Sequence, residues 1–342
     1  MSRPSRPSRW RGQAPRGAML HPMWQGTRSP SNEPWVGRCL LGSGWVACSR
    51  RLSVLDLRLW AAFGALLEAQ VPEPPADDPS LANADTRTVH TTGYQLADMV
   101  LDDDSGHSYR RLSASMLRLA TTRACMHVVE PDPELALRHI RGGYVALLGD
   151  IWDATTELQL RTPREWGALS GHTSLRVEIG RWSAREIVSN PHGSTWIDLD
   201  LLRALGSGLP ARMWAALESW ASWPQRSMDG REECAIGLAE PARQSLGVGD
   251  YQHARQARAA LNRAGARIVA TDPAYELVRC ERRAGWCLVI RRLSGARARA
   301  QARSGAPWRS PGIAATKRAR PERAAVRATA AESLATAQRK RA

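Results

Sequence analysis

The chain has 342 residues, 43% of them hydrophobic, and its formal net charge is +15 at pH 7. This length is sufficient for two domains with a sizeable core, and the charge suggests a nucleic-acid partner. No apolar run reaches the roughly 20 residues that a membrane-spanning helix needs, so no membrane partner is expected.

The positive charge lies at the two ends of the chain. Residues 1–51 contribute +8 and residues 294–342 contribute +10, and subtracting both from +15 leaves −3 for the middle. A segment with low apolar content and excess like charge buries too little surface to offset the entropy of ordering. We therefore expect disordered basic tails over residues 1–51 and 294–342. The stretch VGRCLLGSGWVAC is interrupted by glycine and makes a poor signal peptide, so a cytoplasmic protein is expected.

The cysteines and histidines form no metal-binding pattern. None of the six cysteines belongs to a CxxC pair, and the eight histidines include no HExxH or HxH spacing. Because structural zinc sites need ligands in close pairs, we expect free thiols, no metal and no cofactor. Cys280 and Cys287 are spaced to face each other across a hairpin.

In chain order, the first predicted element is a buried helix over residues 52–70, with Ser53 as its N-cap. After an acidic, proline-rich loop, a second helix begins within VHTTGYQLADMVLDDD. A Ser-Gly turn joins it to a third helix over residues 108–120. The runs ACMHVVE and YVALLGDIWDA have the composition of strands. Residues 71–104 hold eight acids and one arginine, so they are expected to point away from nucleic acid.

The order helix, helix, turn, helix, strand, strand is typical of the winged-helix variant of the helix-turn-helix, whose third helix enters the major groove of DNA. On a helical wheel of residues 108–120, the outward face carries Arg110 and Arg118, with Arg111 at its flank. We therefore predict that these three arginines contact DNA. The alternative is an amphipathic surface helix whose arginines are only solvated.

The second half repeats this plan. LRVEIGRW predicts a strand, and TWIDLDLLRALGSGLPARMWAALESWASWP predicts two helices separated by GSGLP. LAEPARQSLG then predicts a short helix, followed by a turn and a helix over residues 251–264 that ends at a glycine. ARIVATDPAYELVRCERRAGWCLVIRRL alternates like strands, with RRAG at the tip of the last hairpin. The predicted fold class is α+β, with tandem winged-helix (helix-turn-helix) domains over residues 52–165 and 166–293.

The helix over residues 251–264 is predicted to be the main DNA reader. Arginine can bind O6 and N7 of guanine with two hydrogen bonds, and glutamine or asparagine can bind adenine in the same way. The residues expected on the outward face or at its margins have such side chains: Gln252, Arg255, Gln256, Arg258, Asn262 and Arg263. The alternative is again a solvated polar face.

The last hairpin is predicted to be a second contact surface. Residues 251–292 contain nine arginines and three acids, a local charge of +6, and Arg282 and Arg283 lie at the hairpin tip. Wings commonly lie along the phosphate backbone, where positive charge gives affinity without reading sequence. We therefore expect both arginines to contact phosphates.

The chain resembles the RepA-type plasmid replication initiators, which are built of two winged helices in tandem. The resemblance covers roughly residues 52–293 and lies in LRLWAAFGALLEAQ, TTGYQLADMVLDDDSGHSYRRLSASMLRLATT, TWIDLDLLRALGSGLPARMWAALESW, EPARQSLGVGDYQHARQARAALNRA and the WCLVIRR strand. The acidic loop, the long basic tails and Trp214, where the family more often has tyrosine, depart from the family pattern.

The resemblance implies a bacterial, plasmid-associated protein that binds repeats in double-stranded origin DNA, promotes melting of nearby DNA and recruits host replication proteins. It also implies stronger specific contacts by the second domain and pairing of the first in a homodimer. Such a protein is not an enzyme. The alternatives are a winged-helix transcriptional regulator, a nicking initiator and a protein-binding winged-helix module. The lack of an HxH partner for the tyrosines argues against nicking, and the lack of GxxxxGK[ST] argues against an ATPase.

Overall fold

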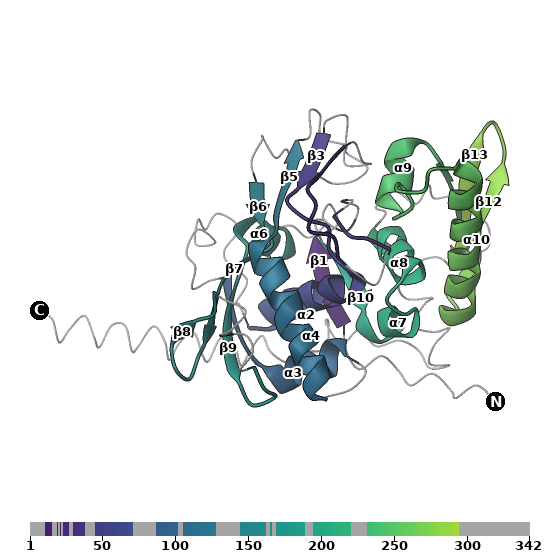
Figure 1. The fold of residues 1–342 in the computed structure, drawn as a ribbon. Coiled ribbons are helices and arrows are strands. Elements are labelled where there is room, and N and C mark those ends of the chain that lie inside the picture. The colour runs from purple at the N-terminus through teal and green to yellow at the C-terminus, as the bar shows by residue number, and fades with distance from the viewer. Residues whose placement is uncertain are drawn as a thin grey trace, which may run out of the picture. The chain divides into compact units, whose positions relative to one another are not determined.

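The structure is a computed structural model (Figure 1). It describes residues 11–15, 19, 21, 23–26, 30–37, 45–70, 87–101, 105–127, 144–161, 165, 169–188, 194–219 and 231–293. The fold is mixed helix and sheet, as predicted, and Met1–Ser294 form one compact unit. Within the described ranges, no helix is long and apolar enough to cross a membrane. The predicted basic tail over residues 294–342 lies outside the described residues.

The three helices predicted in the first half are present and begin at the expected polar residues. They are α2 (Val54–Gln70), α3 (Gly93–Val100) and α4 (Gly106–Thr121). Each cap hydroxyl accepts a hydrogen bond, at 3.1–3.4 Å, from the backbone N–H three residues further on: Ser53, Thr92 and Ser105. These hydroxyls satisfy N–H groups that have no partner within their helix. Helices α3 and α4 both pack against the buried α2.

The strands of the first half lie in two four-stranded antiparallel sheets. The first has the order β2 (Trp35–Gly37), β3 (Trp45–Cys48), β5 (Arg123–His127) and β6 (Tyr144–Ala146). The second has the order β4 (Thr88–Thr92), β9 (Ser174–Ile179), β7 (Leu148–Asp153) and β8 (Leu158–Gln159). Strands β5 and β6 lie in the two runs predicted as strands, and they pair antiparallel. The predicted strand over residues 144–154 is instead divided at the buried Leu147 between the two sheets.

Strand β9 belongs to a sheet of the first half, although the sequence assigns it to the second domain. Val177 of β9 lies opposite Val89 of β4 and opposite Ile151 of β7, and all three side chains are buried. The predicted domain boundary between residues 165 and 166 therefore falls within one sheet. Helix α6 (Arg181–Val188), which follows β9, is not predicted from the sequence.

The prediction of a disordered tail over residues 1–51 is wrong for the part that the structure describes. Strand β1 (Arg11–Pro15) pairs antiparallel with β10 (Ser194–Asp198), a segment that the sequence assigns to a helix. Met19, Met23 and Trp24 are at most 1% exposed and belong to the core. The few apolar residues are sufficient because distant parts of the chain supply a strand partner and a hydrophobic surface, neither of which is visible in local composition.

Arg212 anchors this N-terminal segment. Its side chain is completely buried, and the guanidinium donates to the carbonyl oxygens of Met19 at 2.7 Å and Trp24 at 3.0 Å. Two further bonds, at 3.3 and 2.6 Å, go to His21 O and Ser245 O. The planar fork of five N–H donors thus ties the segment to the second half. Burial lowers the pKa of His21 to about 4, so its ring is neutral at neutral pH.

The second half contains the predicted helices and the final hairpin. Helices α7 (Leu199–Ala204) and α8 (Leu209–Ser219) flank the GSGLP break, and α9 (Glu240–Ser245) precedes α10 (Ala254–Thr271). The hairpin consists of β12 (Tyr275–Arg282) and β13 (Trp286–Leu293). A strand that is not predicted, β11 (Arg231–Gly237), completes the sheet by pairing with β13. Helix α10 lies against this sheet (Figure 1).

Gly265 lies inside α10, so the prediction that the helix ends at this glycine is wrong. The helix continues to Thr271, and the backbone at Gly265 lies very close to β12. A Cβ added at this position would be 2.0 Å from the carbonyl oxygen of Val278. Glycine is therefore required for the close approach of helix and sheet.

We expect Gly265→Ala to lower the free energy of unfolding by about 1–3 kcal/mol, because α10 must move away from β12 to accommodate the methyl group. Urea unfolding measures this loss. Gly237→Ala is the control, since nothing lies within 4 Å of a Cβ added there. Equal unfolding midpoints for the two variants would contradict the close-approach explanation.

Two arginines join the halves, and each binds backbone carbonyls at the end of a helix in the other half. Arg58 of α2 donates to Leu202 O and Gly206 O at the end of α7, at 3.0 and 2.8 Å. In return, Arg203 of α7 donates to Leu101 O at the end of α3, at 2.6 Å. A cation at a helix C-terminus is favourable because the last carbonyls lack partners and the helix dipole is negative there. The two halves are therefore packed into one unit.

The cysteines that the structure describes are free thiols: Cys48, Cys125, Cys234, Cys280 and Cys287. Cys280 lies opposite Leu288 in the hairpin, whereas Cys287 lies opposite Glu281. Because directly paired residues share a face and neighbours alternate, Cys280 and Cys287 are on opposite faces of the sheet. The prediction that they face each other is wrong.

Candidate nucleic-acid interface

One side of α10 packs against β12 and α8. Its buried residues recur at helical spacing and are small or aliphatic: Ala257, Ala260, Leu261, Ala264, Gly265 and Ile268. The small side chains let the helix lie close to its supports. His253 and Ala254, at the start of the helix, are exposed.

The opposite side of α10 and the residues just before it form an exposed strip, which we term the reader strip. Its members are Gln252, Arg255, Gln256, Ala259 and Arg263. Over the described ranges, Arg255 and Arg263 make no hydrogen bond or ion pair with the protein. The two arginines are about 12 Å apart along the helix axis, at 1.5 Å per residue. Ala259 lies midway between them on the same strip, and its short side chain leaves the surface low at that point.

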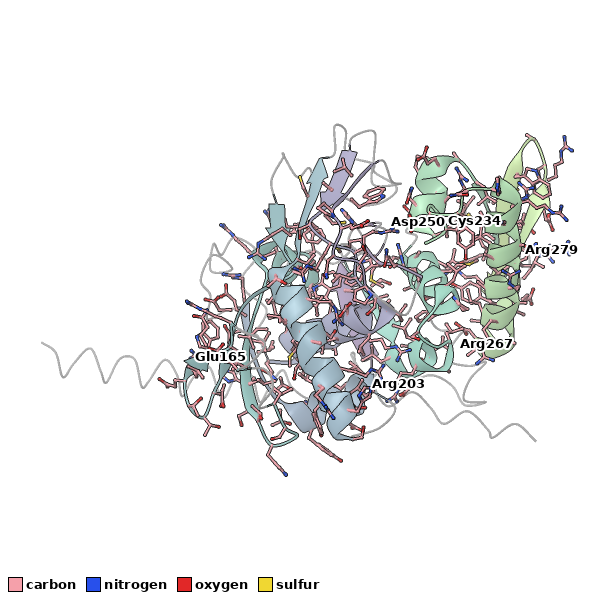
Figure 2. The ribbon with its side chains drawn as sticks, viewed as in Figure 1. Glu165, Arg203, Cys234, Asp250, Arg267 and Arg279 are labelled. Carbon is pink, nitrogen blue, oxygen red and sulfur yellow. The ribbon has the colours of Figure 1, made fainter. Side chains whose placement is uncertain are left out.

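Arg267 marks the end of the reader strip. It lies one turn beyond Arg263, but its Nη2 donates to Ala204 O of α7 at 2.9 Å (Figure 2). This contact directs its guanidinium toward the protein. The C-terminal part of α10 is thereby tied to α7, whereas Arg255 and Arg263 form no hydrogen bond or ion pair with the residues that the structure describes.

Two predicted reader residues are engaged by the hairpin instead. The guanidinium of Arg258 stacks over the ring of Trp286, with its Cζ 4.1 Å from the ring centroid. Asn262, one turn further along, accepts a hydrogen bond from Cys280 N at 2.7 Å. Both side chains lie on the flank of α10 that faces β12. Both residues therefore hold the helix on the hairpin, and their contact with bases stays a prediction.

The arginines at the hairpin tip differ in their surroundings. Arg282 lies opposite Trp286, on the face that packs on α10. It is exposed and, among the residues that the structure describes, makes no hydrogen bond or ion pair. Arg283, by contrast, forms an ion pair with Glu233 at 2.8 Å and lies 3.7 Å from Glu281. Of the two predicted phosphate contacts, Arg282 is available and Arg283 is engaged.

Sequence analysis missed two acidic residues of this surface, Glu232 and Glu233. Both lie on the unpredicted β11, where Glu232 pairs with Arg292 at 2.8 Å and Glu233 pairs with Arg291 at 2.9 Å. The local charge of +6 for residues 251–292 omits them because they lie earlier in the chain. The sequence does contain a signal for this strand, because apolar residues alternate in the run EECAIG at Cys234 and Ile236.

Helix α4 presents Arg110 and Arg111 close to its N-terminus. Both are exposed, as predicted. Arg110 Nε makes only a long bond, 3.4 Å, to Gly106 O of its own helix. The first turn of α4 has no acidic residue, and cations near a helix N-terminus oppose the helix dipole. These arginines therefore do not stabilise the helix at this position. Their exposed side chains can bind an anionic partner.

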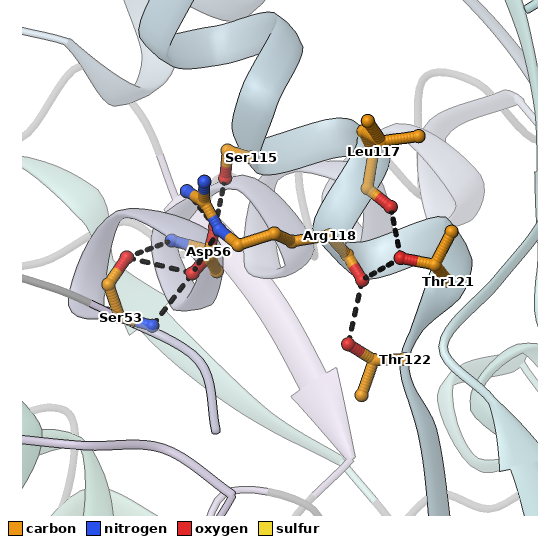
Figure 3. Close-up of polar contacts among 7 residues, drawn as sticks. All are labelled: Ser53, Asp56, Ser115, Leu117, Arg118, Thr121 and Thr122. Atoms are coloured by element: carbon orange, nitrogen blue, oxygen red, sulfur yellow. Dashed lines mark hydrogen bonds and ion pairs between the residues drawn. The ribbon is translucent and has the colours of Figure 1, made fainter. Parts of the chain in front are cut away.

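Arg118 is predicted to lie on the exposed face of α4, but in the structure its side chain is mostly buried. Its guanidinium binds both carboxylate oxygens of Asp56 on α2, at 2.8–3.2 Å (Figure 3). Asp56 is completely buried and also accepts hydrogen bonds from the hydroxyl groups of Ser53 and Ser115. The ion pair joins α2 to α4. The prediction that Arg118 is exposed is therefore wrong, because a buried carboxylate 62 residues away holds the guanidinium, and its contact with DNA stays a prediction.

No protein-family model and no curated protein matches the chain. It is similar to the solved structure of selenomethionine derivatives of domains 2 and 3 of RctB, with 10% identity and a TM-score of 0.49 over 82% of this chain and 99% of that one. It is also similar to the Pi initiator protein in complex with iteron DNA, with 12% identity and a TM-score of 0.46 over 84% and 99%. For the RctB domains 2-3, the identity is 11% and the TM-score 0.44 over 82% and 97%. These values are too low to transfer a function, which has to be inferred from the chain's own residues.

Proposed function

We propose that the chain binds double-stranded DNA sequence-specifically and performs no covalent chemistry. The observation that carries this proposal is the reader strip of α10, on which Arg255 and Arg263 are exposed and make no hydrogen bond or ion pair with described protein residues. Arginine and glutamine can each form two hydrogen bonds to a base edge in the major groove. Arg282 stands on the neighbouring face of the hairpin, where it can bind a phosphate.

We further propose two winged helices in tandem. In the second half, α8, β11, α9, a tight turn, α10 and the hairpin follow the order of a winged helix with α10 as its recognition helix. In the first half, α2, α3 and α4 precede strands β5 and β6, and α4 takes the equivalent third position. Arg110 and Arg111 then make α4 the secondary reader.

Within that class we propose replication initiation at a plasmid origin. The support is the sequence resemblance over roughly residues 52–293, together with the joining of both halves through Arg58 and Arg203. Two readers in one unit engage a long site and can use binding energy to deform the duplex, which favours melting of AT-rich DNA. Recruitment of host replication proteins and pairing of the first half in a homodimer belong to the same proposal.

Selection of bound sequences from a pool of random duplexes, followed by footprinting, tests the DNA-reading proposal. We expect one enriched sequence and a protected segment longer than a single winged helix covers. Failure to enrich or protect any sequence would refute the proposal and favour a protein-binding module.

A plasmid assay separates initiation from transcriptional regulation. Repeats of the selected sequence are placed beside an AT-rich stretch on a plasmid that lacks an initiator, and the chain is supplied in trans. We expect replication that depends on the chain and on the repeats. Repression of a reporter placed after the same repeats, without replication, would instead identify a regulator.

We expect Arg282→Ala to weaken binding to every duplex about equally and to reduce the salt slope of log K by about one, because the residue is placed for a phosphate. Titration of a selected and an unselected duplex at several salt concentrations measures both effects. Arg283→Ala is the matched comparison and should have a smaller effect, since Glu233 already holds this arginine. A loss confined to the selected duplex would show that Arg282 reads bases.

A further inference from the structure

The face of the β11–β13–β12 sheet opposite α10 carries a connected network of ion pairs. Glu233 of β11 binds Arg283 through Oε1 at 2.8 Å and Arg291 through Oε2 at 2.9 Å. Glu281 of β12 binds Arg279 at 2.7 Å and lies 3.7 Å from Arg283. Glu233 therefore bridges two arginines, and Arg283 at the hairpin tip lies between two carboxylates. Figure 2 shows Arg279 on this hairpin.

Strand register explains how these residues meet. Glu233 lies opposite Arg291, Val289 lies opposite Arg279, and neighbouring positions alternate between faces. Val289 is only 1% exposed although it is on the face away from α10. The ion-paired residues and the buried Val289 thus share one face of the sheet.

The charges of this network nearly cancel. Three arginines, Arg279, Arg283 and Arg291, contribute +3, and two glutamates, Glu233 and Glu281, contribute −2, which leaves +1. The hydrogen bond from Arg283, followed by that from Arg291, lowers the pKa of Glu233. Glu233 is thus ionised at neutral pH and holds both arginines electrostatically. An arginine held in this way is less available to a phosphate than Arg282, which makes no described protein contact.

We propose that Glu233 is a specificity-determining residue that holds Arg283 away from DNA phosphates and so limits binding to duplexes of arbitrary sequence. Phosphate contacts strengthen binding to all sequences alike, whereas the reader strip distinguishes between them. Withholding one phosphate contact therefore lowers the background of non-specific binding without altering base recognition. Arg283 lies in the turn between β12 and β13, so strand register does not fix its side chain to the face away from α10 once the carboxylate is removed. This inference rests on the proposed DNA-binding function.

The test compares the full chain with Glu233→Gln, which retains the size of the side chain and removes its charge. The probes are an unselected duplex and the duplex enriched from the random pool. We expect Glu233→Gln to bind the unselected duplex roughly two- to fivefold more tightly at moderate salt, because exposed ion pairs are weak and a released arginine can exchange into a phosphate contact. The salt slope for that duplex should become steeper by about one.

Glu157→Gln is the matched control. It changes net charge by the same amount at an exposed turn residue between β7 and β8, outside the hairpin sheet. We expect its affinity and salt slope to equal those of the unaltered chain. The double variant Glu233→Gln with Arg283→Ala should lose the gain, because Arg283 supplies the new contact. Thermal unfolding of each variant verifies that the fold is retained.

Three outcomes overturn this inference while leaving the proposed function intact. One is an unchanged affinity of Glu233→Gln for the unselected duplex, and another is a weaker affinity, which would mean that Glu233 positions the arginines for DNA. Persistence of the gain in the double variant likewise excludes Arg283 as the released residue. Failure of the unaltered chain to bind any duplex is a different result, since it removes the proposed function itself.

Discussion

Replacing Arg212 by methionine is expected to lower the free energy of unfolding by about 3–5 kcal/mol, since each buried acceptor left without a donor costs about 1–3 kcal/mol. The guanidinium donates to four backbone carbonyls, three of them in the N-terminal segment that packs beside α8. Methionine fills a similar volume, so the loss reports mainly on the hydrogen bonds. Urea unfolding followed by tryptophan fluorescence measures it.

The N-terminal segment should detach at lower denaturant concentration than the rest of the variant unfolds. Hydrogen exchange of β1 measures this directly, because its amides pair with β10. Arg185→Met is the control, since Arg185 is exposed on α6, and surface substitutions of this kind change stability by about 0.5 kcal/mol or less. A loss below about 1 kcal/mol for Arg212→Met would mean that the segment is held by its apolar side chains alone.

Arg255→Ala and Arg263→Ala are each expected to weaken binding to the selected duplex by about 1–3 kcal/mol, a factor of about 5 to 150, if each guanidinium binds a guanine. Neither side chain contributes to the described protein contacts, so folding should be unaffected. The loss should be concentrated at one or two base pairs of the site. Binding titrations against single-base variants of the selected duplex measure this.

Charge loss alone also weakens binding, so a matched control is needed. Arg181→Ala removes one positive charge from an exposed position on α6, away from α10. It should reduce affinity for selected and unselected duplexes by the same small factor. If Arg255→Ala and Arg263→Ala behave like Arg181→Ala, the reader strip does not read sequence. Retained affinity of both variants for the selected duplex would exclude α10 as the reader.

Several elements were predictable because their signals are local. Ser53, Thr92 and Ser105 precede apolar residues at helical spacing, and the helices α2, α3 and α4 begin directly after them. The exposure of Arg255 and Arg263 follows from the same periodicity, since Ala257, Leu261 and Ala264 occupy the buried side of the helix. A cap and a helical wheel depend only on residues within a few positions of each other.

The remaining features depend on residues that are distant in sequence. A helical wheel places Arg118 and Arg258 on or near the outward face, but Asp56 holds the first and Trp286 stacks under the second. The N-terminal segment is another case of dependence on distant residues. Its composition predicts disorder, but in the structure Arg212 and β10 bind it and hold it in place. Gly265 also depends on a distant residue. Glycine is required there because β12 lies too close for a side chain, and not because the helix ends.

The sequence by itself determined most of the helices, the exposure of the reader strip and the basic character of the hairpin, because periodicity, capping and charge are properties of neighbouring residues. Only the tertiary structure decided which arginines are available to DNA. An arginine pairs with whichever carboxylate, carbonyl or aromatic ring the fold brings within reach, and that partner is set by packing between segments far apart in the chain.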